Sequence, residues 1–437
     1  MIKNDIVTLK IDGYASNGDG VAHYDGRAIF VRRALRGEIV DAHILKVTNT
    51  AIFAKIERVI ESSPERIEPA CPHYNKCGGC DTQHMSYAEE LRYKRERVSD
   101  ALRRLGGTEV DLPEVVPSPQ TEAYRNKAIF EVSVRGGAAD VGFYREHSHE
   151  IVPVDSCPIQ SEAANLAAAA LRDWVSACGV ADGAVRGLFV REGGDAVQVA
   201  LITPLKKIAN IQLFIEKLRE SITKPLSVAL ITQKMPSNVA LSGVITTLFG
   251  KEYLEDTLGG LTFRLSPRAF YQVNRPQAEQ LYAEAIRYAA LTDGDTALDL
   301  YCGAGTITLS LAKSAPENAK IIGAEIVADA VKNAKVNAKL NDISNAEFIL
   351  ADAAEVTETA SVVVVDPPRK GLAIEVVDAI AQMSPKRVVY VSCDPATLAR
   401  DVKLFAARRF TVKTARAFDM FPRCAHVETV VLLERNA

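Results

Sequence analysis

The stretch TALDLYCGAGTITLSLAKS, residues 296–314, decides the fold of the carboxyl-terminal part of the chain. It begins as an apolar strand, continues into a glycine-containing loop and ends with helical periodicity. Further apolar strands follow it (KIIGAEI, EFILA, SVVVVD and RVVYVSC), together with the helical segments ADAVKNAKVNAKLN and PATLARDVKLF. Continuous apolar strands alternating with amphipathic helices predict a Rossmann-like, doubly wound parallel sheet over residues 266–437.

The first 60 residues contain short alternating segments separated by the turn sequences NGDG and YDG. The strand-like segments are VTLKI, GVAHY, RAIFV, EIVDAHILKV and FAKIERVI. This pattern predicts a small closed β-barrel over residues 1–60, and such barrels commonly bind oligonucleotides through one face. A barrel with a purely structural role is the alternative.

Residues 61–265 mix β-rich and helical segments, which predicts an α+β central domain. The domain opens with the cysteine-rich sequence CPHYNKCGGC and the polar helical sequence SYAEELRYKRERVSDALRRLG. The 437 residues exceed what one hydrophobic core usually organises. We therefore expect a multidomain α/β protein.

Composition narrows the class of protein. No apolar run approaches the roughly 20 residues that span a bilayer, so we expect no membrane segment. The start, MIKNDIVTLKIDGY, lacks the features of a secretory signal, which predicts a cytoplasmic protein with reduced cysteines. The net charge of −3 argues against non-specific coating of nucleic acid, although a local basic groove is compatible with it.

The loop after the first strand of the carboxyl-terminal sheet predicts a nucleotide-type cofactor site. Gly303 and Gly305 allow close backbone approach, and Glu325 ends the next strand, where a carboxylate can accept both ribose hydroxyls. A dinucleotide fingerprint would have glycine or alanine where Thr308 stands. S-adenosylmethionine has no phosphate, so the loop favours this methyl donor over a dinucleotide or a non-binding sheet. Asp352 is a candidate for the adenine edge, or for a helix cap.

Two further strand ends carry reactive side chains. Asp366 lies in DPPR and Cys393 in SCDP, and both segments open toward the face that holds Gly303. A position near a helix amino end predicts a lowered pKa for the thiol of Cys393 and hence a nucleophilic thiolate. The alternative is a small buried hydrophobe. Glu428, in FPRCAHVETV, begins another strand and is either a third member of this group or a surface charge.

A uracil ring explains why these groups would be assembled. Carbon 5 of uracil is a poor nucleophile, and addition of a thiolate to carbon 6 makes it an enolate carbon that can accept a methyl group. A base must then remove the carbon 5 proton before the thiolate can leave.

The cysteine-rich segment predicts a metal site. Cys71, Cys77 and Cys80 have five and two residues between them, and Cys157, followed by proline, is the best candidate for a fourth ligand. Four thiolates suit zinc or an iron–sulfur cluster, and the spacing slightly favours zinc. Free cysteines remain an alternative.

Six segments in order resemble the RNA 5-methyluridine (uracil-C5) methyltransferase family, particularly its 23S ribosomal RNA members with a TRAM domain. They are CPHYNKCGGCDTQ, FYQVN, DLYCGAGTITL, DPPRKG, SCDPATLARD and FPRCAHVE. DPPR alone is weakly specific, but the ordered set covers nearly the whole chain. The resemblance implies S-adenosylmethionine as methyl donor and a TRAM-like, RNA-binding barrel at residues 1–60.

The resemblance also implies roles for individual residues. Cys393 would be the nucleophile and Glu428 the proton-abstracting base, while Gln272 and Asp366 would hold the uracil or neighbouring cofactor groups. The residues implied to line the cofactor site are Tyr301, Glu325 and Asp352. For the four cysteines the resemblance implies a [4Fe-4S] cluster that organises the fold. Cys424 is a departure, because the family tends to have threonine or another small polar residue there.

The expected function is methylation of a uridine in RNA by a cytoplasmic monomer. Ribosomal RNA is the expected substrate and transfer RNA the alternative. Two rival hypotheses remain: a non-catalytic RNA-binding protein, and an amino-group methyltransferase that uses DPPR and needs no cysteine.

Overall fold

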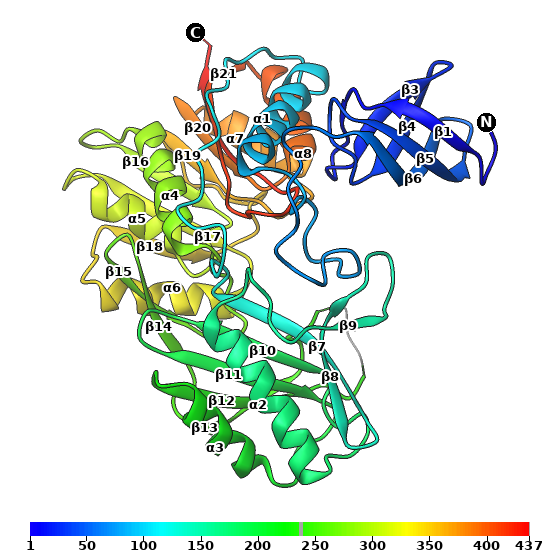
Figure 1. Cartoon of the computed structure of the whole chain (residues 1–437). Helices are drawn as coiled ribbons and strands as arrows, with labels where there is room; N and C mark the ends of the chain where they lie inside the picture. Colours follow the sequence, from blue (N-terminus) through cyan, green and yellow to red (C-terminus); the bar gives the residue numbers. More distant parts are fainter. Residues whose placement is uncertain (236–238, 437) are drawn as a thin grey trace.

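The computed structural model describes residues 1–235 and 239–436. Within these residues the strands form three large sheets and one two-stranded hairpin. The amino-terminal sheet stands to one side of the carboxyl-terminal layers, and the central sheet lies below them (Figure 1). None of the described helices is long and apolar enough to cross a membrane.

The amino-terminal sheet is closed by one bent segment. Its first half, β1 (Ile6–Lys10), pairs with β5 (Ile39–Val47), and its second half, β2 (Gly13–Tyr14), pairs with β3 (Gly20–Tyr24). The sheet is completed by β4 (Arg27–Arg32) and β6 (Ala51–Glu61). The sheet thus returns on itself, and the expected small β-barrel is confirmed.

Helix α1 (Tyr87–Arg104) connects the cysteine-rich segment to the carboxyl-terminal sheet. Its N-cap, Ser86, accepts a hydrogen bond from the amide of Glu89, and two acidic residues occupy the first turn, which favours helix formation there. Val98 and Leu102 are buried in the same apolar core as the carboxyl-terminal strands. The helix therefore packs as a part of the layers that carry the candidate site.

The central sheet has the order β13-β12-β11-β10-β7-β8-β9, with a single parallel pair, β11 and β12, among its described strands. Helices α2 (Glu162–Cys178) and α3 (Ile211–Ser221) pack together beside it around Trp174. The strands are β7 (Lys127–Arg135), β8 (Ala138–Tyr144), β9 (Ile151–Pro153), β10 (Gly187–Glu192), β11 (Val197–Thr203), β12 (Leu226–Thr232) and β13 (Val244–Phe249). This arrangement is the expected α+β domain.

The carboxyl-terminal sheet has the order β18-β17-β16-β19-β20-β22-β21. Its strands are β16 (Thr296–Leu300), β17 (Lys320–Glu325), β18 (Ala346–Leu350), β19 (Val362–Val365), β20 (Arg387–Ser392), β21 (Phe410–Phe418) and β22 (Glu428–Arg435). The first five in this order pair in parallel, as expected, whereas β22 runs antiparallel to both of its neighbours. The sheet is therefore parallel at its centre and mixed at one edge.

Helices cover this sheet and complete its core. They are α4 (Arg275–Ala289), α5 (Thr306–Ser314), α6 (Ala328–Leu340), α7 (Ile374–Met383) and α8 (Pro395–Ala406). A hairpin of β14 (Leu254–Leu258) and β15 (Leu261–Leu265) contributes to the core around α4. The buried side chains on the two faces of the central strands form two separate apolar clusters, as a sheet covered on both faces requires.

Candidate active site

Adjacent strands of the carboxyl-terminal sheet deliver the candidate residues to one edge. Glu325 ends β17, and Tyr301, Asp366 and Cys393 follow the parallel strands β16, β19 and β20. Because β22 is antiparallel to β20, its first residue, Glu428, lies at the same edge. The topology thus brings these predicted cofactor-binding and catalytic residues to one edge of the sheet, the edge at which open parallel sheets bind their ligands.

The loop between β16 and α5 has the geometry expected of a cofactor loop. Gly303 and Gly305 both have positive φ, +55° and +85°. A Cβ at Gly305 would also lie 3.0 Å from the ring of Phe348. The carboxylate of Glu325 accepts hydrogen bonds from the amides of Gly303 at 3.1 Å and Val327 at 2.8 Å. The glycine loop and the carboxylate of Glu325 are therefore held together by a hydrogen bond.

Thr308, the residue that departs from a dinucleotide fingerprint, has a structural partner. Its hydroxyl donates a 2.6 Å hydrogen bond to the carboxylate of Asp299 on β16. Burial raises the pKa of Asp299 to about 7. A Cβ at Gly323 on β17 would lie 2.8 Å from the Thr308 hydroxyl, so the glycine for close packing is on the neighbouring strand.

Asp352 lies in the turn after β18. Its carboxylate accepts a 2.9 Å hydrogen bond from the amide of Ala354, and thus stabilises the turn. Tyr301, in the left-handed region with φ +68°, has its pKa raised to about 12 by burial and by the nearby carboxylates, Asp352 foremost. The two residues predicted at the far side of the cofactor site therefore affect each other.

Cys393 lies beside two carboxyl groups. Glu428 is buried and Asp366 is part-buried, and burial raises their pKa values to about 8 and about 7; the charge of Asp366 raises that of Glu428 further. Arg369, of the DPPR segment, opposes the increase at Glu428. The nucleophile candidate and the base candidate thus share one environment.

The expectation of a lowered pKa for Cys393 is wrong. Burial, and then the charges of Glu428 and Asp366, raise the pKa of the thiol to about 12. The amino end of α8 does not compensate, because Asp394 caps it: its carboxylate accepts hydrogen bonds from the amides of Ala396 at 2.9 Å and Thr397 at 3.0 Å. The amides that were expected to stabilise the Cys393 thiolate are therefore already bonded to the carboxylate of Asp394.

Arg369 is a site residue that motif reasoning did not single out. Its charge lowers the pKa of both Cys393 and Glu428, and its guanidinium lies 3.2 Å from Nε2 of His426. The signal was present in the sequence, because the arginine directly follows the DPP turn. It is the cation that opposes the carboxylates of the site.

Gln272 is buried beside a second residue that the sequence did not indicate. Tyr282, from α4, is hydrogen-bonded to Gln272 and lies 3.2 Å from the hydroxyl of Thr306; Asp366 is close enough to raise its pKa. The backbone carbonyl of Gln272 accepts a hydrogen bond from Asn126 of the central domain. No local motif marks Tyr282, because only the packing of α4 brings it to the crevice.

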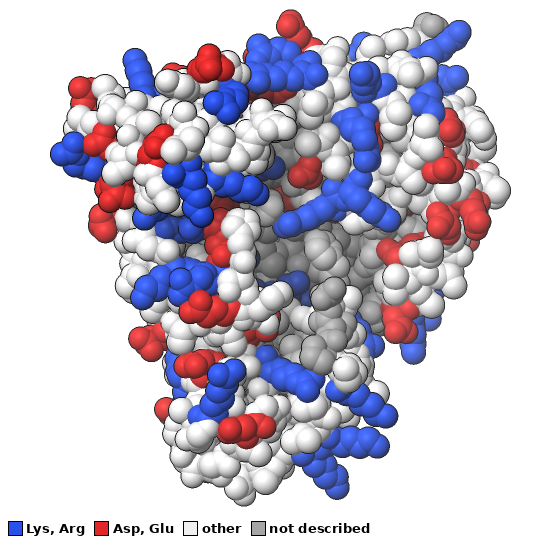
Figure 2. Space-filling view, turned by 90° about the vertical axis from the view of Figure 1, so that its right-hand side faces the viewer, with Lys and Arg blue, Asp and Glu red and all other residues white. Residues whose placement is uncertain are grey.

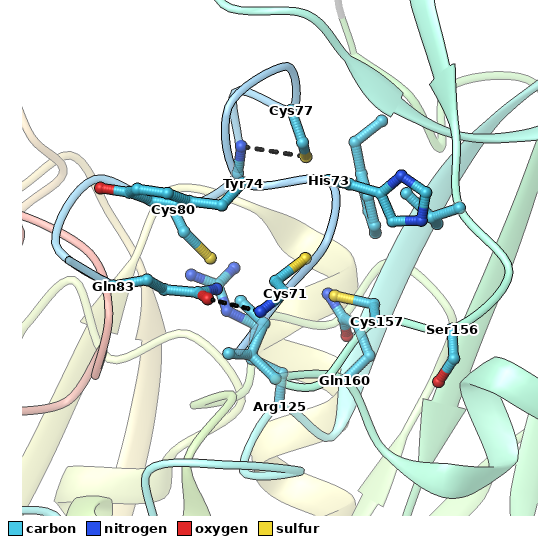
Figure 3. Close-up of a pocket in the computed structure, with 14 residues that line it drawn as sticks. Cys71, His73, Tyr74, Cys77, Cys80, Gln83, Arg125, Ser156, Cys157 and Gln160 are labelled. Carbon is cyan, nitrogen blue, oxygen red and sulfur yellow. Dashed lines mark hydrogen bonds between the residues drawn. The ribbon is translucent and has the colours of Figure 1, made fainter. Parts of the chain in front are cut away.

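The four predicted metal-binding cysteines line one cavity of about 80 Å³. In Figure 3 the thiols of Cys71, Cys77, Cys80 and Cys157 come from two segments and face a common space. All four are free thiols. The loop is held by hydrogen bonds from the Cys71 amide to Gln83 and from the Gly79 amide to the sulfur of Cys77. The fold thus gathers residues that are distant in sequence.

A metal ion sets strict limits on the spacing of its ligands. A single zinc ion with bonds of about 2.3 Å needs its sulfur ligands within about 4 Å of one another. Across residues 1–235 and 239–436, no group of three or more His, Cys, Asp or Glu side chains is set closely enough to hold a metal ion. Among the described residues the four cysteines line a cavity and do not form such a closely spaced group.

The loop that precedes Glu428 lies directly on the cysteine segment. The amides of Asp81 and Thr82 donate to the carbonyl of Arg423, and the carboxylate of Asp81 accepts the amide of Ala425 at 2.8 Å. Cys424 is buried in this contact, with its thiol 3.4 Å from the carbonyl oxygen of Gly79. The cysteine at this position thus belongs to the packing between the two segments.

A basic groove lies between the barrel and the cysteine segment. Its open volume is about 620 Å³, and its cationic lining residues are Arg32, Arg33, Lys55 and Arg66. Figure 2 shows lysine and arginine side chains along the rim of a hollow on one face of the molecule. Local basic character therefore coexists with the net negative charge, as a nucleic-acid substrate requires.

Comparisons with known families match three parts of the chain. Residues 3–56 match the TRAM domain, residues 291–384 a methyltransferase domain, and residues 358–436 the tRNA (uracil-5-)-methyltransferase family. The last match contains the DPPR, SCDP and FPRCAHVE segments.

Whole-chain relatives agree with these matches. RNA methyltransferases of Halalkalibacterium halodurans and Clostridium tetani are 38% and 37% identical, each over 99% of this chain and over 97% and 96% of their own lengths. The crystal structure of Pyrococcus abyssi tRNA (uracil-54, C5)-methyltransferase with S-adenosyl-L-homocysteine is similar, with a TM-score of 0.79 and 27% identity. The similarity covers 98% of this chain and all of that one. The chain therefore belongs to the family of S-adenosylmethionine-dependent RNA uracil-5 methyltransferases.

Proposed function

We propose that this protein methylates carbon 5 of a specific uridine by a covalent route through Cys393 and Glu428. The observation that carries the proposal is the convergence of Cys393, Asp366 and Glu428 at the edge where the cofactor loop ends. The crevice around Gly303, Gly305 and Glu325 would hold the methyl donor. An amino-group methyltransferase would need no thiol beside the carboxylates.

The reaction balances with the groups present. The Cys393 thiol passes its proton to the neighbouring carboxylate of Asp366, the sulfur forms a bond to carbon 6, and the electron pair moves to the carbonyl oxygen as an enolate. Carbon 5 then takes the methyl group from the sulfonium. Glu428 accepts the carbon 5 proton, the double bond re-forms, and the sulfur leaves carbon 6 as thiolate. Gln272 and Asp366 would hold the polar edge of the ring.

The covalent step is testable with RNA that carries 5-fluorouridine at the target. Fluorine cannot leave as a proton, so the wild-type protein should accumulate an adduct that survives denaturation. We expect no adduct with Cys393→Ala. Cys178→Ala, which removes a thiol at the end of α2, should form it normally. An equal adduct in Cys393→Ala would mean that the nucleophile lies elsewhere.

Removal of the base should give a different result. In Glu428→Gln the thiol can still add and the methyl group can still move, but the carbon 5 proton remains. RNA that carries ordinary uridine at the target should therefore accumulate as a covalent complex with the protein, with carbon 5 already methylated. Formation of this complex should require S-adenosylmethionine. The complex should vanish when Cys393→Ala is added. Normal turnover by Glu428→Gln would assign the proton to another group.

We propose that Cys71, Cys77, Cys80 and Cys157 hold a [4Fe-4S] cluster. The support is that the four free thiols, from two distant segments, line one cavity, and that four thiolates suit such a cluster. The methyl transfer needs no electron, so the cluster would hold the cysteine segment against the catalytic loop.

Anaerobically purified protein should be brown and oxygen-sensitive, with iron and sulfide in equal amounts. Serine at any of these four positions should lower the iron content and the solubility. Stoichiometric zinc without iron, from iron-replete cells handled anaerobically, would contradict the cluster.

We propose 23S ribosomal RNA as the substrate, acted on by a cytoplasmic monomer. The support is the combination of an RNA-binding barrel with the four-cysteine segment. Transfer RNA is the alternative, because the similar Pyrococcus protein acts on it. Mapping of 5-methyluridine in total RNA from a strain that lacks the gene would separate them: the modification should disappear from 23S RNA and remain in transfer RNA.

A further inference from the structure

The loop between β21 and β22 is held by residues outside its own sheet. Lys94, a fully buried residue of α1, donates to Asp419 at 2.6 Å, to Glu90 at 2.7 Å and to the carbonyl of Phe421 at 3.1 Å. The same Glu90 accepts the amide of Arg423 at 2.7 Å. Helix α1 therefore fixes the first half of the segment that leads to Glu428.

Arg97, three residues further along α1, reaches the second half. One guanidinium nitrogen donates a 2.5 Å hydrogen bond to the carbonyl of Ala425. The other lies 3.8 Å from the carboxylate of Asp394, the residue after Cys393. The Arg97 side chain is only 15% exposed. A single side chain thus bridges the segments that carry the nucleophile and the base.

We propose that Arg97 is a positioning residue that sets the orientation of Glu428 for proton removal. The inference rests on the proposed role of Glu428. The carboxylate of Asp81 holds the peptide before Ala425, and Arg97 holds the peptide after it, which leads toward Glu428. Together the two bonds fix the direction in which the chain enters β22. Without Arg97, the second of these peptides loses its anchor on α1.

Arg97 contacts Ala425 and Asp394, and these two contacts should differ in importance. Asp394 is also fixed as the N-cap of α8 by the amides of Ala396 and Thr397. The segment after Cys393 should therefore keep its place when the guanidinium is removed. The carbonyl of Ala425 loses a direct hydrogen bond. The base step should then suffer more than the addition of the thiol.

Arg97→Ala, in the full-length protein with its metal group, tests this difference. The first measurement is the rate at which Cys393 forms the adduct with 5-fluorouridine RNA, which should be unchanged. The second is the rate at which RNA with ordinary uridine at the target is released, as methylated product, from its covalent complex. This rate should fall about 10- to 100-fold, as expected when a catalytic group is misplaced by about 1 Å. S-adenosylmethionine affinity, measured by calorimetry, should be unchanged.

Arg95→Ala is the matched control, because Arg95 lies on the same helix and donates a 2.7 Å hydrogen bond to a backbone carbonyl, that of Leu112. It should leave both rates unchanged. Arg97→Lys keeps the charge but cannot span both partners, so release should be slowed less than in Arg97→Ala. This variant also provides the measurement if Arg97→Ala fails to fold.

Parallel assays of Glu428→Gln separate the two proposals. The positioning role of Arg97 would be overturned if Arg97→Ala slowed adduct formation and release equally, or left release unchanged. The proposed role of Glu428 would still hold in either case, provided that Glu428→Gln accumulates the methylated covalent complex. Normal turnover by Glu428→Gln would overturn the proposed role of Glu428 as the base.

Discussion

At the scale of single residues, the surroundings of Cys393 determine its ionisation, because burial and the charges of Glu428 and Asp366 raise the pKa of its thiol to about 12. Cys393 and Asp366 could be placed in one crevice because parallel strand ends share an edge of a sheet. The thiol's pKa could not be predicted, because it depends on burial and on Glu428, which an antiparallel strand delivers. Arg369 is the only cation that affects both Cys393 and Glu428 among the interactions resolved in the described residues.

The buried carboxyl group of Glu428 should lower stability as the pH rises. Its pKa is about 8 in the folded protein and about 4.5 in the unfolded chain, so the folded state binds more protons between these values. The free energy of unfolding therefore falls with pH in this range, at about 1.4 kcal/mol for each unit of pKa difference.

Glu428→Gln removes the titrating group. The variant should melt like the wild type at about pH 5 and at a clearly higher temperature at about pH 9. Glu434→Gln, on the same strand but part-exposed, is the control and should show no such divergence. Equal pH dependence of Glu428→Gln and the wild type would show that Glu428 ionises normally.

At the scale of elements, periodicity predicted the strands and helices of the carboxyl-terminal sheet well, since β19 is wholly apolar and β16, β17 and β20 each have a mainly apolar centre. The docking of α1 could not be predicted in the same way. Its sequence is polar, and the buried Lys94, which pairs with Glu90 on the same helix, finds its second carboxylate in Asp419 of the distant loop. Residues that depend on such long-range partners have no local signal.

The loop between β16 and α5 gives the element-scale prediction. Gly305→Ala introduces a Cβ at φ +85° and 3.0 Å from Phe348, so both strain and contact should displace the loop. We expect S-adenosylmethionine affinity to fall about tenfold or more, since about 1.4 kcal/mol is sufficient for that loss. Gly294→Ala, at φ +76° with open space around its Cβ, controls for backbone strain alone. Equal affinity in both variants would contradict a role of the Gly305 contact.

At the scale of the whole molecule, the barrel is attached to the catalytic layers through α1. Arg36 of the barrel bonds Glu89 at 2.9 Å and Glu96 at 2.7 Å, and Tyr14 donates to the same Glu89 at 2.7 Å. Tyr93 donates to the carbonyl of Ser16. The helix that holds the loop before Glu428 therefore also orients the barrel.

The basic groove beside the barrel should bind the phosphate backbone of the RNA. Lys55 on β6 lines this groove, and each phosphate that a cation neutralises adds about one to the slope of log affinity against log salt. Lys55→Ala should therefore weaken RNA binding and reduce the slope by about 1, with S-adenosylmethionine affinity unchanged. Arg58→Ala, on the same strand but paired with Asp41 at 2.8 Å, should alter neither. Because phosphate contacts carry no sequence information, Lys55→Ala should weaken target and unrelated RNA equally. A loss confined to the target RNA would instead assign the groove to base recognition.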